Sequence, residues 1–290
     1  MTHFLVTGGA GFIGSHLAAE LLVRGHRVRV VDNLATGLLS NVPSGAEFVL
    51  GDLTDPDVAA EVTQGCDVVV HQAAIASVPQ SISEPRPSHE ANIDATFNVL
   101  IAARDAGVRR VVYAASSSAY GDSPVLPKVE DMAVDPLSPY ALQKFVGEEY
   151  CRLFTRIYGL ETVAIRYFNV FGPRQHPSSP YSGVLSLFIK CALSGTAPTI
   201  FGDGEQTRDF TFVDVINVAT GVSVSLNRAW ATLESILGRL QSPVFAAARA
   251  GDVYASEADI GKAERLLGFR PRVTFEEGLR RTVDWARSTL

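Results

Sequence analysis

The chain has 290 residues, of which 47% are hydrophobic and 19% are charged; this composition excludes a disordered chain and is typical of a globular protein. The formal net charge of -6 argues against nucleic acid as a partner, because neutralising phosphates requires clustered Lys and Arg. No stretch reaches the roughly 20 apolar residues that a membrane span needs, and no signal-peptide pattern is seen. Cys66, Cys151 and Cys191 are odd in number and widely spaced, which predicts reduced thiols and a cytoplasmic protein.

Short β-branched runs alternate with helix-length segments through residues 1–166. The expected strands cover residues 3–7, 27–31, 47–50, 67–71, 111–115 and 162–166. Expected helices include residues 11–24, 89–106 and 139–158. The rhythm predicts the Rossmann-like α/β class, a doubly wound parallel sheet with helices on both faces.

The rhythm ends after Asn169. Stretches rich in Pro and Gly at residues 172–183 and 195–204 separate shorter elements, and helical patterns at 256–267 and 275–288 close the chain. We therefore expect a nucleotide-binding domain over residues 1–168. A smaller C-terminal substrate-binding domain is expected over residues 169–290, on the carboxyl edge of the sheet, with some elements returning to the first domain.

A glycine loop lies between the first expected strand and the first expected helix. Gly8, Gly9, Gly11 and Gly14 allow a tight turn and close approach to a pyrophosphate, and the helix N-terminus favours negative charge. The alternative is a simple glycine turn. The loop predicts a dinucleotide site.

Asp32 lies 18 residues beyond Gly14, at the end of the second expected strand. A carboxylate there accepts hydrogen bonds from both hydroxyls of the adenosine ribose and repels a 2′-phosphate. No Arg follows in residues 33–35, so the sequence favours NAD over NADP. Asp52 and Leu53 follow the third strand, where they could hold the adenine edge or form only a turn. Ala73 and Ala74 follow the fourth strand, as a floor under the cofactor or as simple close packing.

Tyr140 and Lys144 lie four residues apart on an expected helix and so share one face. A phenol with a pKa of about 10 is a poor base at neutral pH. An adjacent ammonium and a cationic nicotinamide ring would favour its phenolate and make it a usable base. By itself this spacing is also common in solvated helices.

Taken in order, these motifs resemble the extended short-chain dehydrogenase/reductases, and among them the UDP-hexose 4-epimerases. The resemblance covers residues 3–285 and rests on the glycine loop, Gly51-Asp52-Leu53, His71-Gln72-Ala73-Ala74, the serine run before Tyr120-Gly121, Tyr140 with Lys144, and Arg166-Tyr167-Phe168-Asn169. In those enzymes the counterpart of Tyr140 takes the proton of the sugar 4′-hydroxyl while hydride passes from C4 to NAD. The keto sugar then rotates and recovers the hydride on its other face.

The resemblance implies site residues throughout the chain. The implied catalytic residues are Ser116, Tyr140 and Lys144. The implied NAD contacts are Gly8, Gly11, Phe12, Ile13, Gly14, Asp32, Asn33, Asp52, Leu53, Ala73, Ala74, Tyr140 and Lys144. The implied contacts with a UDP-sugar are Ser116, Ser117, Ser118, Tyr140, Asn169, Phe201, Arg208, Arg249, Asp252 and Ser256. No metal site is expected, and the resemblance implies a homodimer formed through the helices at residues 89–106 and 139–158.

The substrate expectation rests on a small residue. In the resembling enzymes a bulky Tyr at the position of Ser256 limits the pocket to plain hexoses, whereas a small residue admits an N-acetyl group. Uronic-acid epimerases carry Thr in place of Asn169 and Arg in place of His176. We therefore expect turnover of UDP-N-acetylglucosamine and UDP-N-acetylgalactosamine, together with UDP-glucose and UDP-galactose.

Two alternatives stay open. A dehydratase or reductase of the same superfamily would act on a similar nucleotide sugar, but dehydratases carry Asp-Glu where this chain has Ser117 and Ser118. A non-catalytic NAD-binding protein would not need Ser116, Tyr140 and Lys144.

One departure from the resembling family concerns residues 213–221. Family members place a helix there, whereas here Val213-Asp214-Val215 abuts Ile216-Asn217-Val218. We expect either a real deletion or a skipped segment, with a chain break, near Asp214 to Ile216.

Overall fold

The computed structural model describes residues 1–175, 183–213, 219–248 and 253–289, so the expected break near Asp214 to Ile216 lies outside the described residues. The chain forms two compact units, Met1–Ala119 with Pro136–Arg166 and Tyr120–Asp135 with Tyr167–Leu290. Residues 120–135 group with the second unit, where Lys128 pairs its backbone N–H with Glu257 O and its carbonyl with Asp259 N, both at 2.8 Å. The expected division into a nucleotide-binding and a substrate-binding domain at residue 168 stays a prediction.

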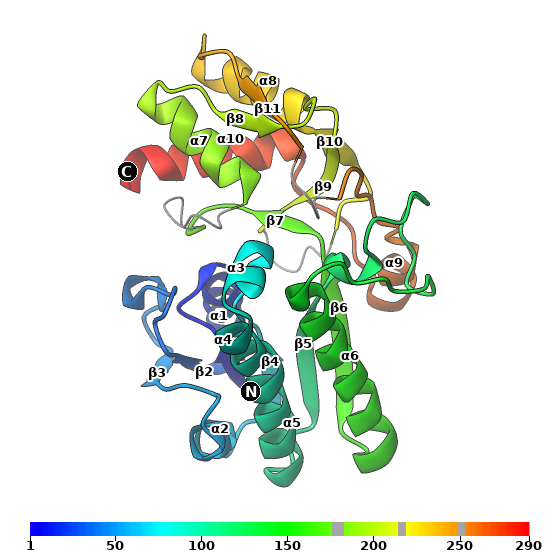
Figure 1. Cartoon of the computed structure of the whole chain (residues 1–290). Coiled ribbons are helices and arrows are strands. Elements are labelled where there is room, and N and C mark those ends of the chain that lie inside the picture. The colour runs from blue at the N-terminus through cyan, green and yellow to red at the C-terminus, as the bar shows by residue number, and fades with distance from the viewer. Residues whose placement is uncertain (176–182, 214–218, 249–252, 290) are drawn as a thin grey trace. The chain divides into compact units, whose positions relative to one another are not determined.

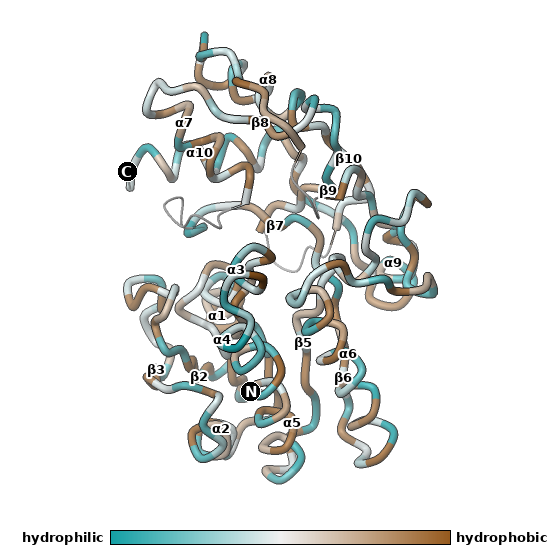
Figure 2. Tube along the Cα trace, viewed as in Figure 1, coloured by the Kyte–Doolittle hydropathy of each residue, from teal (hydrophilic) through white to brown (hydrophobic). Residues whose placement is uncertain are grey.

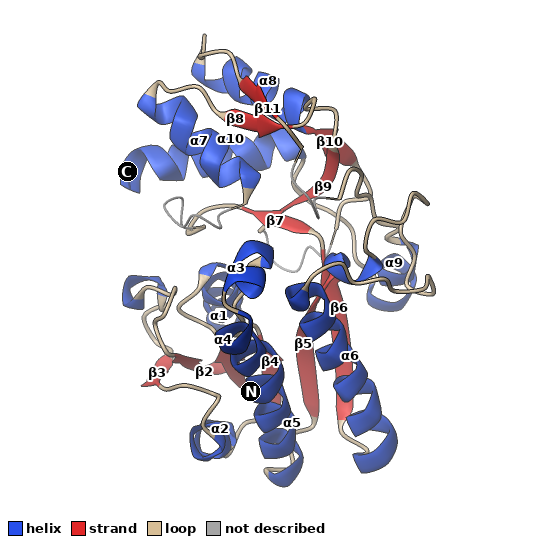
Figure 3. Ribbon diagram, in the orientation of Figure 1, coloured by secondary structure: helices blue, strands red, loops and turns tan. Residues whose placement is uncertain are grey.

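The first unit is built on a six-stranded sheet with the strand order β3-β2-β1-β4-β5-β6 (Figures 1 and 3). The pairs β1–β2, β1–β4, β2–β3 and β4–β5 are parallel. Its elements are β1 (His3–Thr7), α1 (Phe12–Val23), β2 (Arg27–Asp32), η1 (Leu39–Asn41), β3 (Glu47–Leu50), α2 (Pro56–Thr63), β4 (Val68–His71), α3 (Val78–Ser83), α4 (Pro85–His89), a π-helical turn η2 (Glu90–Asp94), α5 (Ala95–Asp105), β5 (Arg110–Ser116), η3 (Ser117–Tyr120), α6 (Pro139–Tyr158) and β6 (Glu161–Tyr167).

Both faces of this sheet are buried, which explains why its strands are continuous apolar runs. Along β1, Leu5 and Val6 are both fully buried and point to opposite faces. Val6 packs in a cluster with Ala18 of α1, and Leu5 packs in a second cluster with Val62 of α2 and Phe154 of α6. Helices on both faces define a doubly wound sheet, as the sequence predicts.

α6 has sequence signals at both ends. Ser138 caps it by accepting a hydrogen bond from Ala141 N at 3.2 Å, and Pro139 occupies the first helical position. Gly159 ends the helix with a φ of +71°. Figure 2 shows hydrophobic and hydrophilic turns alternating along the helix, as in an amphipathic helix packed on a sheet.

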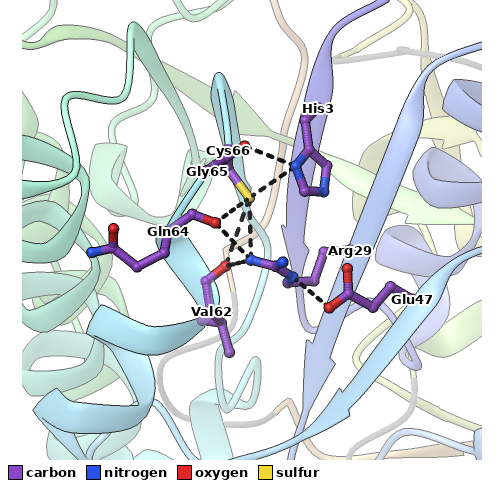
Figure 4. A network of polar contacts seen from close by, with 7 residues as sticks. All are labelled: His3, Arg29, Glu47, Val62, Gln64, Gly65 and Cys66. Atoms are coloured by element: carbon purple, nitrogen blue, oxygen red, sulfur yellow. Dashed lines mark hydrogen bonds and ion pairs between the residues drawn. The ribbon is translucent and has the colours of Figure 1, made fainter.

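Arg29 of β2 fixes the C-terminal end of α2 (Figure 4). Its Nη1 donates to Val62 O at 2.8 Å and to Gln64 O at 2.9 Å, while Nε pairs with Glu47 at 3.0 Å. These bonds satisfy carbonyls that the end of a helix leaves open. The neighbouring Cys66 is buried, which raises the pKa of its thiol above the ordinary value, although Arg29 opposes the shift. We interpret the cluster as structural.

The second unit has its own core. Its elements are β7 (Asn169–Phe171), α7 (Val184–Ser194), β8 (Thr199–Phe201), β9 (Thr207–Phe212), β10 (Ser223–Ser225), α8 (Leu226–Leu237), β11 (Val244–Ala246), α9 (Gly261–Leu267) and α10 (Phe275–Thr289). Buried residues of α7, α8, α10 and the strands form one cluster, in which Phe171, Phe188 and Trp230 make edge-to-face and tilted ring contacts. Among the described residues no helix is long and apolar enough to cross a membrane.

The helix expected over residues 256–267 is shorter than predicted. Only Gly261–Leu267 is helical, whereas residues 256–260 form no helix. The reason is tertiary pairing, since Ala258 forms a parallel bridge with Lys128.

Candidate active site

The loop between β1 and α1 is made of glycines that close backbone contacts require. Gly8 has a φ of +64°, and a Cβ there would lie 2.8 Å from Ala73 Cα, just after β4. A Cβ on Gly14 would lie 2.3 Å from Gly8 O, so the first turn of α1 packs on the loop only without a side chain. One on Gly11 would lie 3.1 Å from the same oxygen. The start of α1, which carries Phe12, is thereby held at the ends of β1 and β4, where helix N–H groups suit a phosphate.

Asp32 ends β2, and its carboxylate is held next to this loop. Oδ2 accepts a hydrogen bond from Ala10 N at 3.0 Å, and Oδ1 accepts one from Leu34 N at 2.8 Å. Leu34 adopts a left-handed conformation with a φ of +57°. Because a carboxylate offers about four lone-pair sites, Asp32 keeps acceptor capacity for further donors such as ribose hydroxyls.

Asn33 and Asp52 are brought together although they lie on different strand ends. Asn33 Nδ2 donates to Asp52 Oδ2 at 2.9 Å. Burial acts to raise the pKa of Asp52, but hydrogen bonds from Thr54 and Asn33 outweigh it, and the net pKa lies below the ordinary value. The side chain of Leu53 is buried in the core, so it is not open to a ligand.

The residues after β4 are tied to the end of β1. Gln72 N and Ala73 N both donate to Thr7 Oγ1 at 3.1 Å. Ala73, which makes one of these hydrogen bonds, and the next residue, Ala74, are both partly exposed. The expected floor therefore lies beside the glycine loop.

Ser116 ends β5, Tyr140 lies in the first turn of α6, and the Ser116 side chain acts on the pKa of the phenol. Burial raises the pKa of the Tyr140 phenol above its ordinary value, and Ser116 opposes this shift. Ser118 donates to Ser116 Oγ through its hydroxyl at 2.8 Å and its N–H at 3.2 Å. The N–H of Tyr140 donates to Ser81 Oγ at 3.1 Å, which fixes the start of α6. Ser117, between the two serines, is partly exposed.

Lys144 lies one turn further along α6 and is 3% exposed. Its Nζ lies 4.5 Å from the centroid of the Tyr113 ring, a cation–π contact. Burial lowers the pKa of Lys144 to about 7, although Cys151 opposes the shift. The expectation that this ammonium flanks the Tyr140 phenol stays a prediction.

Sequence reasoning missed a buried polar set that holds α6 against the π-helical turn. Gln143 Oε1 accepts from Ser88 Oγ at 2.7 Å and from Asn92 Nδ2 at 2.8 Å. Asn92 also exchanges two hydrogen bonds with the backbone of Ile75, at 2.8 and 3.1 Å. The available signal was two polar residues on the core-facing sides of their helices.

The remaining predicted substrate residues that the structure describes lie on strands and loops of the second unit. Asn169 begins β7, Phe201 ends β8, and both are partly exposed. Arg208 on β9 donates from Nη1 to Thr207 O at 2.8 Å and Tyr254 O at 3.3 Å, which brings it near the buried Ser256. Two further predicted residues, Arg249 and Asp252, lie outside the described residues.

A buried carboxylate that the sequence did not single out organises this region. Asp209 is fully buried; Oδ1 accepts from Thr220 N at 2.8 Å and Thr220 Oγ1 at 2.7 Å, and Oδ2 accepts from Gly221 N at 2.9 Å and Ala258 N at 3.3 Å. These donors fill the approximately four acceptor sites of a carboxylate. The strand that carries Arg208 is thereby tied to the segment that carries Ser256.

A glycine loop at the start of a doubly wound sheet, a carboxylate at the end of β2 and a Ser–Tyr–Lys set on β5 and α6 define a dinucleotide-dependent enzyme of the extended short-chain dehydrogenase/reductase type. The chain belongs to the NAD dependent epimerase/dehydratase family, whose model matches residues 4–229. It is an NAD-dependent enzyme.

Known proteins are similar over the whole chain. A UDP-glucose 4-epimerase of Thermotoga maritima, solved with UDP-glucose, is 36% identical, with a TM-score of 0.96 and 99% of each chain covered. A UDP-N-acetylglucosamine 4-epimerase of Methanobrevibacter ruminantium M1, in complex with UDP-N-acetylmuramic acid, is 38% identical, with a TM-score of 0.94 and coverage of 100% of this chain and 99% of that one. A UDP-glucuronate 4-epimerase of Thermodesulfobacterium geofontis is 34% identical over 321 residues, covering 100% of this chain and 98% of the relative.

Proposed function

We propose that this chain is an NAD-dependent UDP-sugar 4-epimerase with Ser116, Tyr140 and Lys144 as its catalytic residues. The observation that carries the proposal is the placement of Ser116 at the end of β5, where its side chain acts on the pKa of Tyr140, with Lys144 one turn further on the same helix as Tyr140. Three similar proteins, each covering nearly the whole chain, are named 4-epimerases of UDP-sugars.

The described residues fit NAD. The close contacts at Gly8 and Gly14 leave no room for a Cβ and bring the N-terminus of α1, with Phe12 and Ile13, to the place of a pyrophosphate. Asp32 retains acceptor capacity for two ribose hydroxyls and would repel a 2′-phosphate. When bound, NAD supplies the hydride acceptor and donor for C4 of the sugar.

Ser116 and Tyr140 would move the proton of the 4′-hydroxyl. Ser118 donates to Ser116 Oγ, so the Ser116 O–H is left to donate toward the phenol oxygen. A hydrogen bond donated by the Ser116 hydroxyl would stabilise a phenolate formed at Tyr140. The phenolate takes the proton of the sugar 4′-hydroxyl and returns it after the keto sugar has rotated and recovered its hydride.

Lys144 would supply positive charge to this reaction. Its pKa of about 7 reflects burial without a paired anion, and a phenolate at Tyr140 would raise it by stabilising the ammonium. A protonated Lys144 in turn lowers the pKa of Tyr140, so the two groups titrate as a coupled pair.

The diphosphate and nucleoside would be held by residues of the second unit. Arg208 presents a guanidinium suited to two phosphate oxygens, and we assign the same role to Arg249. Asn169, Asp252 and Phe201 are the proposed contacts with the rest of the UDP group.

For the sugar itself, we propose UDP-N-acetylglucosamine and UDP-N-acetylgalactosamine, with UDP-glucose and UDP-galactose also accepted. Ser256 is a small side chain, which supports a site that admits a 2-acetamido group. Asn169 and His176 differ from the residues of uronic-acid epimerases, which disfavours a carboxylate-bearing sugar.

A dehydratase is the second candidate. It would need an acid and a base beside Ser116, and Ser117 and Ser118 supply neither. A non-catalytic NAD-binding role would not need Ser116, Tyr140 and Lys144 together.

We also propose a cytoplasmic homodimer formed through α5 and α6. Large apolar side chains on these helices are exposed in the single chain, namely Phe97 at 38%, Leu153 at 41%, Ile157 at 62% and Tyr158 at 50%. Phe145, also on α6, is only partly exposed. Exposed apolar area of this kind is typical of an interface between two copies.

The experiment that tests the function is incubation with single UDP-sugars without added cofactor, followed by separation of the products. Conversion of each sugar into its C4 epimer, with no net change in NADH absorbance, is expected. Loss of water from the sugar, or a strict requirement for added NADPH, would contradict the proposal.

A further inference from the structure

A string of buried hydrogen bonds runs through the first unit from β1 to the π-helical turn. Thr7 Oγ1 lies 2.7 Å from His71 Nδ1, and His71 Nε2 lies 3.0 Å from Thr96 Oγ1. Thr96 Oγ1 donates to Asn92 O at 2.8 Å. All four side chains are at most 1% exposed, so water does not substitute for these bonds.

The donors and acceptors fix the tautomer of His71. Thr7 Oγ1 accepts from Gln72 N and Ala73 N, which uses both of its lone pairs, so its hydrogen points at His71 Nδ1. Nδ1 is therefore an acceptor, and the proton of a neutral imidazole lies on Nε2, from which it is donated to Thr96. If Nδ1 carried the proton, its N–H would face the Thr7 O–H, and two donors cannot form a hydrogen bond with each other.

The groups around the ring agree with a neutral imidazole. Tyr113 of β5 stacks on it with the ring centroids 5.8 Å apart, and Lys144 of α6 is the charged neighbour. Burial, helped by Lys144, lowers the pKa of His71 to about 3.

The two ends of this chain of hydrogen bonds contact different parts of the proposed active site, the glycine loop and helix α6. At one end, Thr7 holds Ala73, whose backbone packs against Gly8 of the glycine loop. At the other end, Asn92 bonds Gln143, the residue before Lys144 on α6. One imidazole thus lies between the floor of the proposed cofactor site and the helix that carries the proposed base.

We propose that His71 is a positioning residue, which as a neutral Nε2–H imidazole couples the floor of the NAD site to the helical turn that orients α6. The proposal rests on the NAD site described above. Without this coupling, NAD binds more weakly and the proton transfer slows, whereas UDP, for which we propose contacts in the second unit, binds as before.

The first test is ¹⁵N NMR of the imidazoles, in which the His71 signals are assigned by their loss in His71→Gln. We expect an Nε2–H tautomer with an unprotonated Nδ1 that does not titrate between about pH 6 and pH 9. A proton on Nδ1, or titration in that range, would overturn the proposal.

The second test compares Thr96→Val with Thr63→Val. Both threonines are buried and donate to a carbonyl four residues earlier, Asn92 O at 2.8 Å and Ala59 O at 2.7 Å, but Thr96 also accepts from His71. The Kd of NAD and kcat should each worsen roughly 10-fold in Thr96→Val, as for a buried group left unpaired, and stay near wild type in Thr63→Val. The Kd of UDP should be unchanged in both.

The outcomes separate the two proposals. Equal NAD affinity in the two valine variants would overturn the role of His71. A wild-type protein that holds NAD but epimerises no UDP-sugar would overturn the proposed function, and the NAD affinities would still test His71.

Discussion

A Cβ built on Gly147 would lie 2.2 Å from the hydroxyl oxygen of Tyr113. α6 therefore lies on β5 only because this helix position has no side chain. The Tyr113 hydroxyl donates to Lys144 O at 3.3 Å, and the ring of Tyr113 supports the ammonium of Lys144. The Tyr113 side chain therefore affects both how closely α6 packs on β5 and where the Lys144 ammonium lies.

Gly147→Ala should destabilise the protein by about 1 to 3 kcal/mol, because Tyr113 is fully buried and has no free direction in which to move. Urea denaturation measures the change. Arg156→Ala, on the exposed side of the same helix, is the control and should lie within about 0.5 kcal/mol of wild type. Equal stability of Gly147→Ala and wild type would contradict the close contact.

Tyr140→Phe should reduce kcat by about 10² to 10⁴-fold, because it removes only the acid/base group. UDP binding should be unchanged. Tyr150→Phe, which removes a phenol hydroxyl elsewhere on the same helix, is the control and should keep the wild-type kcat. Turnover of Tyr140→Phe close to wild type would remove Tyr140 from the mechanism.

The stability of the NAD-free protein should rise between about pH 7 and pH 9. Burial lowers the pKa of Lys144 from its ordinary 10.5 to about 7, so in this range the unfolded chain binds more protons than the folded one. The free energy of unfolding then rises by up to about 1.4 kcal/mol per pH unit. Above about pH 9 the burial of Cys151, which raises its pKa from 9.0 to about 12, acts in the opposite direction.

Urea denaturation across this pH range checks the prediction, with Lys144→Met as the comparison. The slope should disappear in the variant. The same rise in both proteins would mean that another group is responsible.

Ser256→Tyr should abolish the reaction with UDP-N-acetylgalactosamine and spare that with UDP-galactose, because overfilling a pocket costs roughly 1 to 3 kcal/mol or more. The ratio of kcat/KM for the two substrates is the measurement, and Ser256→Ala should keep the wild-type ratio. If the Tyr variant treats both substrates alike, or wild type ignores the acetylated one, Ser256 is not the gate.

A homodimer should be seen by light scattering at micromolar concentration. Ile157→Glu together with Leu153→Glu places charge on exposed apolar positions of α6 and should yield monomer. Leu266→Glu on α9, equally exposed, should not change the mass. A wild-type monomer would contradict the proposed interface.

The sheet and α6 were predictable because their signals are local. Strands at the centre of the sheet, such as β1 and β4, are short apolar runs that are mostly buried, and α6 has Ser138 at its start and Gly159 at its end. The short helices α2 and α3 were not predicted, although Asp55 and Ser77 cap them, because few residues define their periodicity.

Residues of the candidate site could be predicted only where they belong to a recognisable sequence motif. The sequence placed Ser116, Tyr140 and Lys144 on the right elements, and Asp32 at the end of β2. It could not place His71 between Thr7 and Thr96, because those partners lie 64 and 25 residues away and meet only through strand pairing and helix packing. The prediction of a helix from Ser256 was wrong for a similar reason, because Ala258 pairs with Lys128, which is distant in the sequence.

The saturated carboxylate of Asp209 limits how this enzyme can be redesigned. Its four donors come from three residues, namely Thr220 through both its N–H and its hydroxyl, Gly221 and Ala258. Moving the backbone at Ala258, two residues after Ser256, would therefore remove one of the hydrogen bonds that hold this buried carboxylate. Side-chain replacement at fixed backbone is thus the route by which substrate preference can drift, and transplanting the loop from another enzyme would require the whole strand, turn and loop to be moved as one block.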